Sequence, residues 1–323
     1  MLTRQFRAGY MLLGLLLFLF TACAGQPAGL LRPNGVAVAP DGSFYVMDKG
    51  NNRVIHLSAT GEFLDTFGRL GREPNDIFSG WDVALASSGN IYISNHIFNE
   101  DASYRSHDGI KVFRPNGQFS QEIGGQDYRF DDGFHYTPYG LDIDSEGRLY
   151  VANFDANSVR VFDAAGQPVA DFFGERGSGP GQFNGISYVA VDSQRNLLYA
   201  NDEGNSRIQQ FDLRLASTGQ LTAAHRLSIG AFGQEAGQFS YPQDIAIDNA
   251  SGRVYVADMG NRRIQVFDPD GQYLTEFTQA HEWQVIGLDV GPAGAVYATD
   301  ALNNRILVFE PDGQLRRQIE PTR

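Results

Sequence analysis

The sequence predicts an all-β fold, a six-bladed β-propeller of four-stranded antiparallel blades. The main observation is a repeat marked by six tyrosines in apolar runs: Tyr45, Tyr92, Tyr150, Tyr199, Tyr255 and Tyr297. Their spacings are 47, 58, 49, 56 and 42 residues. A period of about 40–50 residues made of four short strands is typical of a propeller. The 37 glycines suit many tight turns, and the six copies fill residues 33–323 as one propeller domain.

The first 22 residues predict a lipoprotein signal peptide. Arg4 and Arg7 precede a short apolar stretch, residues 11–20, which is too short to span a bilayer as a lasting anchor. The Thr-Ala-Cys ending resembles a bacterial lipobox, although Phe20 stands where Leu is usual. We expect lipidation at Cys23, the only cysteine, so no intramolecular disulfide is possible. The alternative is an ordinary cleaved signal that ends beside a stray cysteine.

Residues 23–32 form a short tether to the first strand. We therefore expect a monomer in the cell envelope, held at its membrane through the lipid anchor only. Ala24, rather than Asp, follows the cysteine, and by resemblance to Gram-negative lipoproteins this favours the outer membrane. The net charge of −13 repels phosphate backbones, which argues against a nucleic-acid partner.

The runs within each copy predict strands that become more polar from the hub to the rim. The first two runs are apolar on both faces, as in residues 35–38 and 44–47, because each sheet lies between two neighbouring sheets. The third run remains apolar, as in residues 263–268, and the fourth is more polar, as in residues 272–277.

Pro-Asp-Gly and Pro-Asn-Gly turns fall on one side of the predicted disc, because they join first to second or third to fourth strands. They lie at residues 40–42, 115–117, 269–271 and 311–313. We call this side the turn face. The second-to-third loops and the blade connections, whose lengths vary, form the opposite side, which we call the variable face.

Four second-to-third loops share a motif in which Asp and Arg are five residues apart. They read DKGNNR (48–53), DEGNSR (202–207), DMGNRR (258–263) and DALNNR (300–305). We expect Asp–Arg pairs in these loops. In blade three Asn153 and Ser158 replace the pair, and blade two has Asn95 with no equivalent Arg. Metal binding by the ring of repeated Asp and Asn is the alternative, but a functional site would not recur in every blade.

With these loops, the YVAD-type strands and the Gly-Gln-Phe connectors at 181–183 and 237–239, the chain resembles the NHL-repeat family. The resemblance implies the propeller fold. It leaves activity open, because the family includes peptide-binding and RNA-binding modules, kinase sensor domains and a lyase.

Two insertions on the variable face, residues 96–109 and 124–140, belong to neighbouring blades and mix acids with aromatics. We predict a binding surface there, formed by Trp81, His96, Tyr104, His107, His135, Tyr136 and Tyr139. The acids of the insertions favour a neutral or cationic ligand: Glu100, Asp101, Asp108, Asp127, Asp131 and Asp132. Alternatively, these aromatics only pack the loops onto the disc. We expect residues 212–225 to form a loosely held hairpin at the rim.

No catalytic residue, metal site or cofactor is predicted. The zinc histidines of the family's amidating lyase would match Asn34, Tyr139 and Gln243, and none of these is His. A metal site built from His96, His107 and His135 across the loops stays open as an alternative. The sequence thus predicts a non-catalytic envelope lipoprotein that binds a protein, peptide or saccharide partner on the variable face. The alternative function is a metal-dependent lyase or lactonase of the propeller type.

Overall fold

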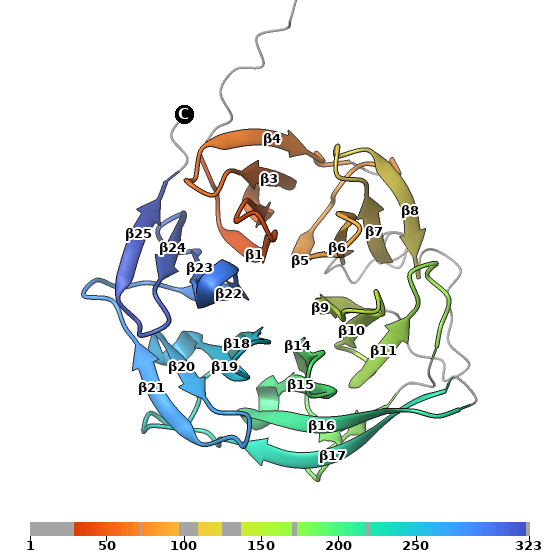
Figure 1. The fold of residues 1–323 in the computed structure, drawn as a ribbon, viewed down its shortest axis with the longest axis vertical. Helices are drawn as coiled ribbons and strands as arrows, with labels where there is room; N and C mark the ends of the chain where they lie inside the picture. The colour runs from red at the N-terminus through yellow and green to blue at the C-terminus, as the bar shows by residue number, and fades with distance from the viewer. Residues whose placement is uncertain are drawn as a thin grey trace, which may run out of the picture.

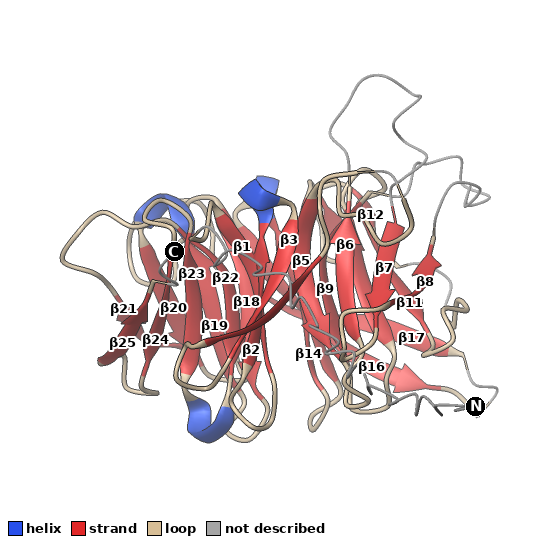
Figure 2. Cartoon of the chain, turned by 90° about the horizontal axis from the view of Figure 1, so that it is seen from above, coloured by secondary structure: helices blue, strands red, loops and turns tan. Residues whose placement is uncertain are grey.

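The computed structural model confirms six blades around a central axis (Figure 1). It describes residues 29–71, 73–96, 109–124, 137–169, 173–217 and 220–320. Strands run between the two faces of the disc, as the view at right angles shows (Figure 2). No helix in these ranges is long and apolar enough to cross a membrane.

Each blade is a meander whose first strand lines the axis. The innermost strands are β1 (Pro33–Val38), β5 (Gly80–Leu85), β9 (Pro138–Ile143), β14 (Ile186–Asp192), β18 (Pro242–Asp248) and β22 (Val285–Val290). The second strands are β2 (Phe44–Asp48), β6 (Ile91–Asn95), β10 (Leu149–Asn153), β15 (Leu197–Asp202), β19 (Arg253–Asp258) and β23 (Val296–Asp300). The third strands are β3 (Arg53–Leu57), β7 (Gly109–Phe113), β11 (Ser158–Phe162), β16 (Arg207–Leu215), β20 (Arg263–Phe267) and β24 (Arg305–Phe309). The outer strands are β4 (Phe63–Phe67), β8 (Phe119–Ile123), β17 (Leu221–Ile229), β21 (Tyr273–Phe277) and β25 (Leu315–Ile319).

The described part of blade three has three strands and two bridges toward its rim, Val159 with Phe173 and Phe162 with Pro168. The connection from blade three to blade four contains the short parallel pair β12 (Glu175–Arg176) and β13 (Gln182–Phe183).

The core consists of six apolar clusters, one at each interface between neighbouring blades. Each cluster contains one of the six repeated tyrosines, which explains the spacing in the sequence. Tyr255, for example, is fully buried beside Val285 of the next blade. Both faces of the inner strands are therefore enclosed, as their apolar sequences predict.

The ring closes without exchanging a strand between the first and last blades, because blade one and blade six are each one continuous stretch of chain. Side chains join them instead. The Thr299 hydroxyl donates to the carbonyl of Asn34 at 2.7 Å, and the Val38 amide donates to Asp289 at 2.7 Å.

The two faces carry the loops that the sequence predicts. On the turn face, Gly42 has a φ of 83°, the left-handed conformation that glycine adopts without a steric penalty. On the variable face, short 3₁₀ turns follow three second strands: η1 (Lys49–Asn51), η3 (Glu203–Asn205) and η4 (Met259–Asn261). A further turn, η5 (Pro292–Gly294), lies between β22 and β23.

The hairpin predicted at the rim for residues 212–225 is present, but the expectation that it is loosely held is wrong. This segment continues β16 and β17 in regular pairing, from Asp212 with Ala224 to Leu215 with Leu221. The hairpin packs against blade three, because Leu221 is buried in the cluster shared with Val161. Residues 218 and 219 lie outside the described ranges.

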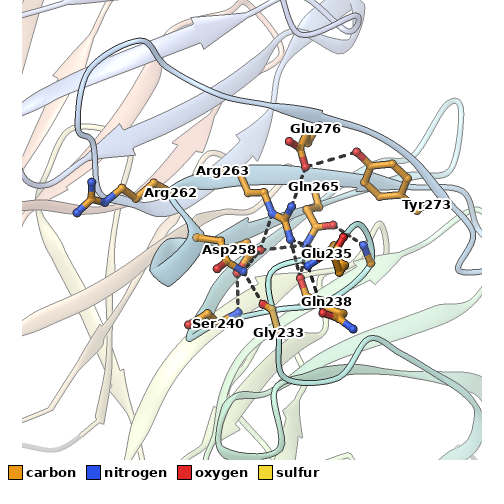
Figure 3. A network of polar contacts seen from close by, with 12 residues as sticks. Gly233, Glu235, Gln238, Ser240, Asp258, Arg262, Arg263, Gln265, Tyr273 and Glu276 are labelled. Atoms are coloured by element: carbon orange, nitrogen blue, oxygen red, sulfur yellow. Dashed lines mark hydrogen bonds and ion pairs between the residues drawn. The ribbon is translucent and has the colours of Figure 1, made fainter.

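The predicted Asp–Arg pairs are present in blades one, four, five and six, with Nε–Oδ2 distances of 2.8, 2.7, 2.8 and 2.8 Å. Figure 3 shows the pair of Asp258 and Arg263. The Arg263 guanidinium also donates to the carbonyls of Glu235 and Gln238, so the pair fixes the connection from blade four.

The ring of Asp and Asn has one shared role. In every blade its side-chain oxygen accepts a backbone N–H from the connection that precedes the inner strand. The donors are Leu31, Phe78, Thr137, Asn184, Ser240 and Gln284. Asn serves this role as well as Asp, so blades without the Arg need no carboxylate.

Candidate functional site at the mouth of the channel

Two rings of equivalent residues surround the entrance to the central channel on the variable face. The outer ring is the residue after each anchoring Asp or Asn: Lys49, His96, Phe154, Glu203, Met259 and Ala301. The inner ring is the second residue of each innermost strand: Asn34, Trp81, Tyr139, Ser187, Gln243 and Ile286. Backbone bonds hold residues of the outer ring against the connections that lead into the innermost strands. The amide of Phe154, for example, donates to the carbonyl of Thr137 at 3.0 Å. We call these two rings the mouth.

Aromatic rings form a continuous row along the mouth from blade two to blade three. Trp81 stacks on Tyr139 with ring centroids 4.6 Å apart, and Tyr139 stacks on Phe154 at 4.6 Å. His96 lies 5.8 Å from Tyr139. Offset stacking at these separations stabilises each pair by ~0.5–1.5 kcal/mol beyond the burial of area.

Three of the predicted binding residues are therefore brought together: Trp81, His96 and Tyr139. Tyr139 is 6% exposed and His96 is 5% exposed, whereas Trp81 is partly exposed. Of these three, only Trp81 offers a partly open surface to a ligand, and the other two support it. The remaining predicted residues lie outside the described ranges: Tyr104, His107, His135 and Tyr136. The acids of the two insertions lie there too, as does most of the alternative three-histidine metal site.

Cationic groups lie at the blade-one end of the aromatic row. The Lys49 ammonium is 2.8 Å from the centroid of the Trp81 ring, a cation–π contact. Burial, with a smaller contribution from the charge of nearby Arg32, lowers the pKa of Lys49 to about 7. Within the described ranges neither cation forms a salt bridge.

Acidic groups lie at the other end, in blades three and four. Burial raises the pKa of Glu203. Hydrogen bonds with the side chains of Ser187 and Gln243 lower this pKa and offset part of the rise. Glu203 and Asp155 line a pocket of about 400 Å³ next to Phe154. Arg176 and Asn184 line the same pocket. No salt bridge of either carboxylate is found in the parts of the chain that the structure describes.

Below the mouth, four aspartates join the inner strands of neighbouring blades; we call them the channel carboxylates. Each accepts one backbone N–H from its own strand and one from the next blade. Asp82 bonds to Leu141, Asp142 to Val191, Asp244 to Leu288 and Asp289 to Val38, at 2.7–3.0 Å. Gly35 of blade one leaves space for the Asp82 side chain of blade two, since a Cβ at Gly35 would lie 2.3 Å from the Asp82 carboxylate.

Burial makes these carboxyl groups weaker acids than usual. It raises the pKa of Asp82 and of Asp142 to about 7 and that of Asp289 to about 6, and it raises that of Asp244 well above the usual value. Repulsion from the other channel carboxylates adds to the shift for the first two and for Asp244. They surround a cavity of about 200 Å³.

The channel carboxylates do not form a compact set of metal ligands. The register places Asp82 and Asp244 one level nearer the mouth than Asp142 and Asp289, two residues or ~7 Å along the strand. Among the described residues, no group of three His, Cys, Asp or Glu side chains is arranged to hold a metal ion.

Sequence reasoning missed the outer ring, apart from His96, and the channel carboxylates. A signal for the outer ring was present. The loops DKGNNR, DEGNSR, DMGNRR and DALNNR keep the Asp, the Asn at the fourth position and the Arg, yet the residue after the Asp differs in each. The channel carboxylates alternate between two strand positions, so no single column of the repeat reveals them.

Comparison with known proteins identifies a repeat in this chain but does not identify an activity. The NHL repeat model matches residues 30–57 and 239–267. A probable peptidyl-alpha-hydroxyglycine alpha-amidating lyase of Caenorhabditis elegans is 26% identical over 197 residues, 58% of this chain and 53% of the lyase. The chain thus spans about half of the lyase. Human NHL repeat-containing protein 3 is 22% identical over 290 residues, 73% of this chain and 79% of that protein.

Among solved structures, a gluconolactonase from Xanthomonas campestris aligns with a TM-score of 0.61 and 16% identity, over 85% of this chain and 84% of the enzyme. This similarity shows the fold alone. The chain is a six-bladed β-propeller in which two segments match the NHL repeat, and the proteins similar to it include a probable lyase.

Proposed function

We propose that this propeller is a non-catalytic binding protein of the bacterial cell envelope, which captures its ligand at the mouth on the variable face. One observation carries the proposal. At the outer ring, six equivalent positions, each directly after the anchoring Asp or Asn, hold an amine, an imidazole, a phenyl ring, a carboxylate, a thioether and a methyl group. The bond of the preceding Asp or Asn is the same in every blade and does not require these differences, whereas a ligand that contacts each blade differently does.

The mouth also has the composition of a ligand site. A partly exposed Trp81 supported by stacked rings is a rigid apolar platform, and polar groups at both ends of the row supply orientation. Envelope peptides, proteins and saccharides are the ligand classes that we propose. The expected lipid anchor at Cys23 would keep the mouth within a short tether of the membrane.

The test compares three forms of the purified full-length protein on arrays of tetrapeptides and of neutral oligosaccharides. The forms are the wild type, Trp81→Ala, and Tyr273→Ala as a control with a half-exposed aromatic on an outer strand. We expect saturable binding of one ligand class that falls at least about tenfold in Trp81→Ala and is unchanged in Tyr273→Ala. Equal binding by all three forms, or no binding to either array, would contradict the proposal.

A metal-dependent lyase or lactonase is the second candidate. It is favoured by the similarity to an amidating lyase and by the buried channel carboxylates with pKa values near neutrality. It ranks second because the carboxylate oxygens already accept backbone N–H groups and lie at two levels. Metal analysis of the purified protein distinguishes the two candidates: a stoichiometric divalent ion lost in Asp142→Asn would favour the enzyme.

A further inference from the structure

The charges at the mouth are separated by sign: basic side chains lie at one end of the aromatic row and acidic side chains at the other. Lys49 and Arg32 lie close enough for the charge of one to lower the pKa of the other. Asp155 and Glu203 lie at the opposite end of the aromatic row and both affect the pKa of Tyr139. Within the described residues neither of these two basic side chains forms a salt bridge, so both are open to an acidic group of a ligand.

The aromatic row lies between the two charged ends. From the Lys49 ammonium to the Trp81 centroid is 2.8 Å, and two stacking steps of 4.6 Å lead on to Phe154. The pocket of about 400 Å³ with both carboxylates begins beside Phe154. A row of this length is covered by about three or four residues of extended peptide, which rises ~3.3 Å per residue.

We propose that the mouth binds a short peptide with both ends free. Its carboxylate lies at Lys49 and Arg32, its side chains rest on the partly exposed Trp81 and Phe154 of the aromatic row, and its amino group lies at Glu203 and Asp155. This inference rests on the proposed function and names the ligand class and its direction.

A ligand of one charge sign fits the mouth less well. A neutral saccharide would leave charges at both ends without partners, and desolvating an unpaired charge is costly. An anionic glycan would gain at Lys49 but meet repulsion at Glu203. The acidic pocket contains two carboxylates and Arg176, so its net charge is −1, and a single amino group of a ligand neutralises this charge.

The test uses the full-length protein and the tetrapeptide Ala-Phe-Ala-Ala in four forms: free, N-acetylated, C-amidated, and blocked at both ends. The variants Lys49→Met and Glu203→Gln each remove one charge with little change in volume. We expect amidation to weaken binding to the wild type about tenfold and to have little effect on Lys49→Met. Acetylation should likewise weaken binding to the wild type about tenfold and have little effect on Glu203→Gln.

The opposite pairing, with amidation sensed by Glu203 and acetylation by Lys49, would overturn the direction. Binding that changes less than twofold when the ends are blocked would overturn the inference and leave the proposed function standing. If the protein bound only oligosaccharides and Trp81→Ala lost this binding, the peptide inference would likewise be overturned and the proposed function would stand. No binding of any probe would overturn both.

The chain offers a second readout that does not depend on the variants folding well. It contains two lysines, Lys49 and Lys111, and Lys111 is buried with its ammonium bonded to the Pro74 carbonyl. Amine acylation followed by mass spectrometry therefore reports on Lys49, with Lys111 as an internal control. The free peptide should slow acylation of Lys49 several-fold and the C-amidated peptide should not. Equal protection by both forms would contradict the inference.

Discussion

The Nε of Arg263 donates to Oδ2 of Asp258 at 2.8 Å, and the two side chains are 8% and 0% exposed. The same carboxylate accepts from the Ser240 amide and from the side chains of Asn261 and Gln265. The pair therefore joins the end of β19 to the connection from the preceding blade. In blade three Asn153 alone makes the corresponding bond, to the Thr137 amide, and Ser158 stands at the position of the Arg, so the fold itself offers a neutral replacement.

Replacing Arg263 alone should be strongly destabilising. Arg263→Met leaves the Asp258 carboxylate buried without its cation, which costs about 3–5 kcal/mol of unfolding free energy. The double variant Asp258→Asn with Arg263→Ser copies blade three and should lose less. Urea denaturation of both variants checks this, and a double variant less stable than Arg263→Met would contradict it.

Closure of the ring depends on a buried hydroxyl. Thr299 Oγ1 accepts from the Gly287 amide at 2.8 Å and donates to the Asn34 carbonyl at 2.7 Å, across the interface of blades six and one. Thr299→Val should cost about 1–3 kcal/mol because both backbone groups lose their partner. Thr66→Val, which removes an exposed hydroxyl bonded to the Val54 carbonyl, is the matched control. Equal melting temperatures for the two variants would count against this account of closure.

The channel carboxylates predict that stability falls as pH rises. The folded pKa values are raised to about 7 for Asp82 and Asp142 and about 6 for Asp289, above the value of about 4 in an unfolded chain. The folded state therefore binds more protons, and this stabilising contribution is fully present below about pH 4 and is lost as the pH rises to about 7. We expect a higher melting temperature at pH 5.5 than at pH 8.

Asp142→Asn should reduce that difference, because an amide does not titrate, and Asp312→Asn on the surface should leave it unchanged. Melting curves of the three proteins at both pH values are sufficient. A wild-type melting temperature that rises from pH 5.5 to pH 8 would contradict the prediction, because it would show that ionising the channel carboxylates does not reduce the stability of the folded protein.

Lipidation at Cys23 stays a prediction, because this residue lies outside the described ranges. Cys23→Ser should abolish incorporation of labelled fatty acid in a bacterial host and release the protein from its membrane. Undiminished labelling of that variant would rule out the anchor.

The fold was predictable because its physical causes repeat in every blade. One tyrosine per interface cluster and one Asp–Arg loop in four blades leave a periodic mark in the sequence. The mouth was predictable only in part. His96 and Tyr139 were identified from the two insertions, and Trp81 as an aromatic expected on the same face. The burial of Tyr139 and His96 depends on stacking between blades, which spacing does not show.

The charged ends of the mouth were missed because each is a single deviation in one copy of the repeat. Lys49 and Glu203 occupy the same loop position in blades one and four, and only the closed ring relates them as the ends of one row. The channel carboxylates were missed for a similar reason, since their pairing is with backbone groups of the next blade.

The fluorescence of Trp81 tests most directly whether the ligand binds at the mouth. The chain has two tryptophans, and Trp283 is buried against Phe309 in the core, so Trp283→Phe leaves Trp81 as the sole reporter. Titration of this full-length variant with Ala-Phe-Ala-Ala should give a saturable change in Trp81 emission, as the ligand carboxylate draws the Lys49 ammonium from the indole face. Calorimetrically detected binding of the peptide without any change in Trp81 emission would contradict the claim and place the site elsewhere on the disc.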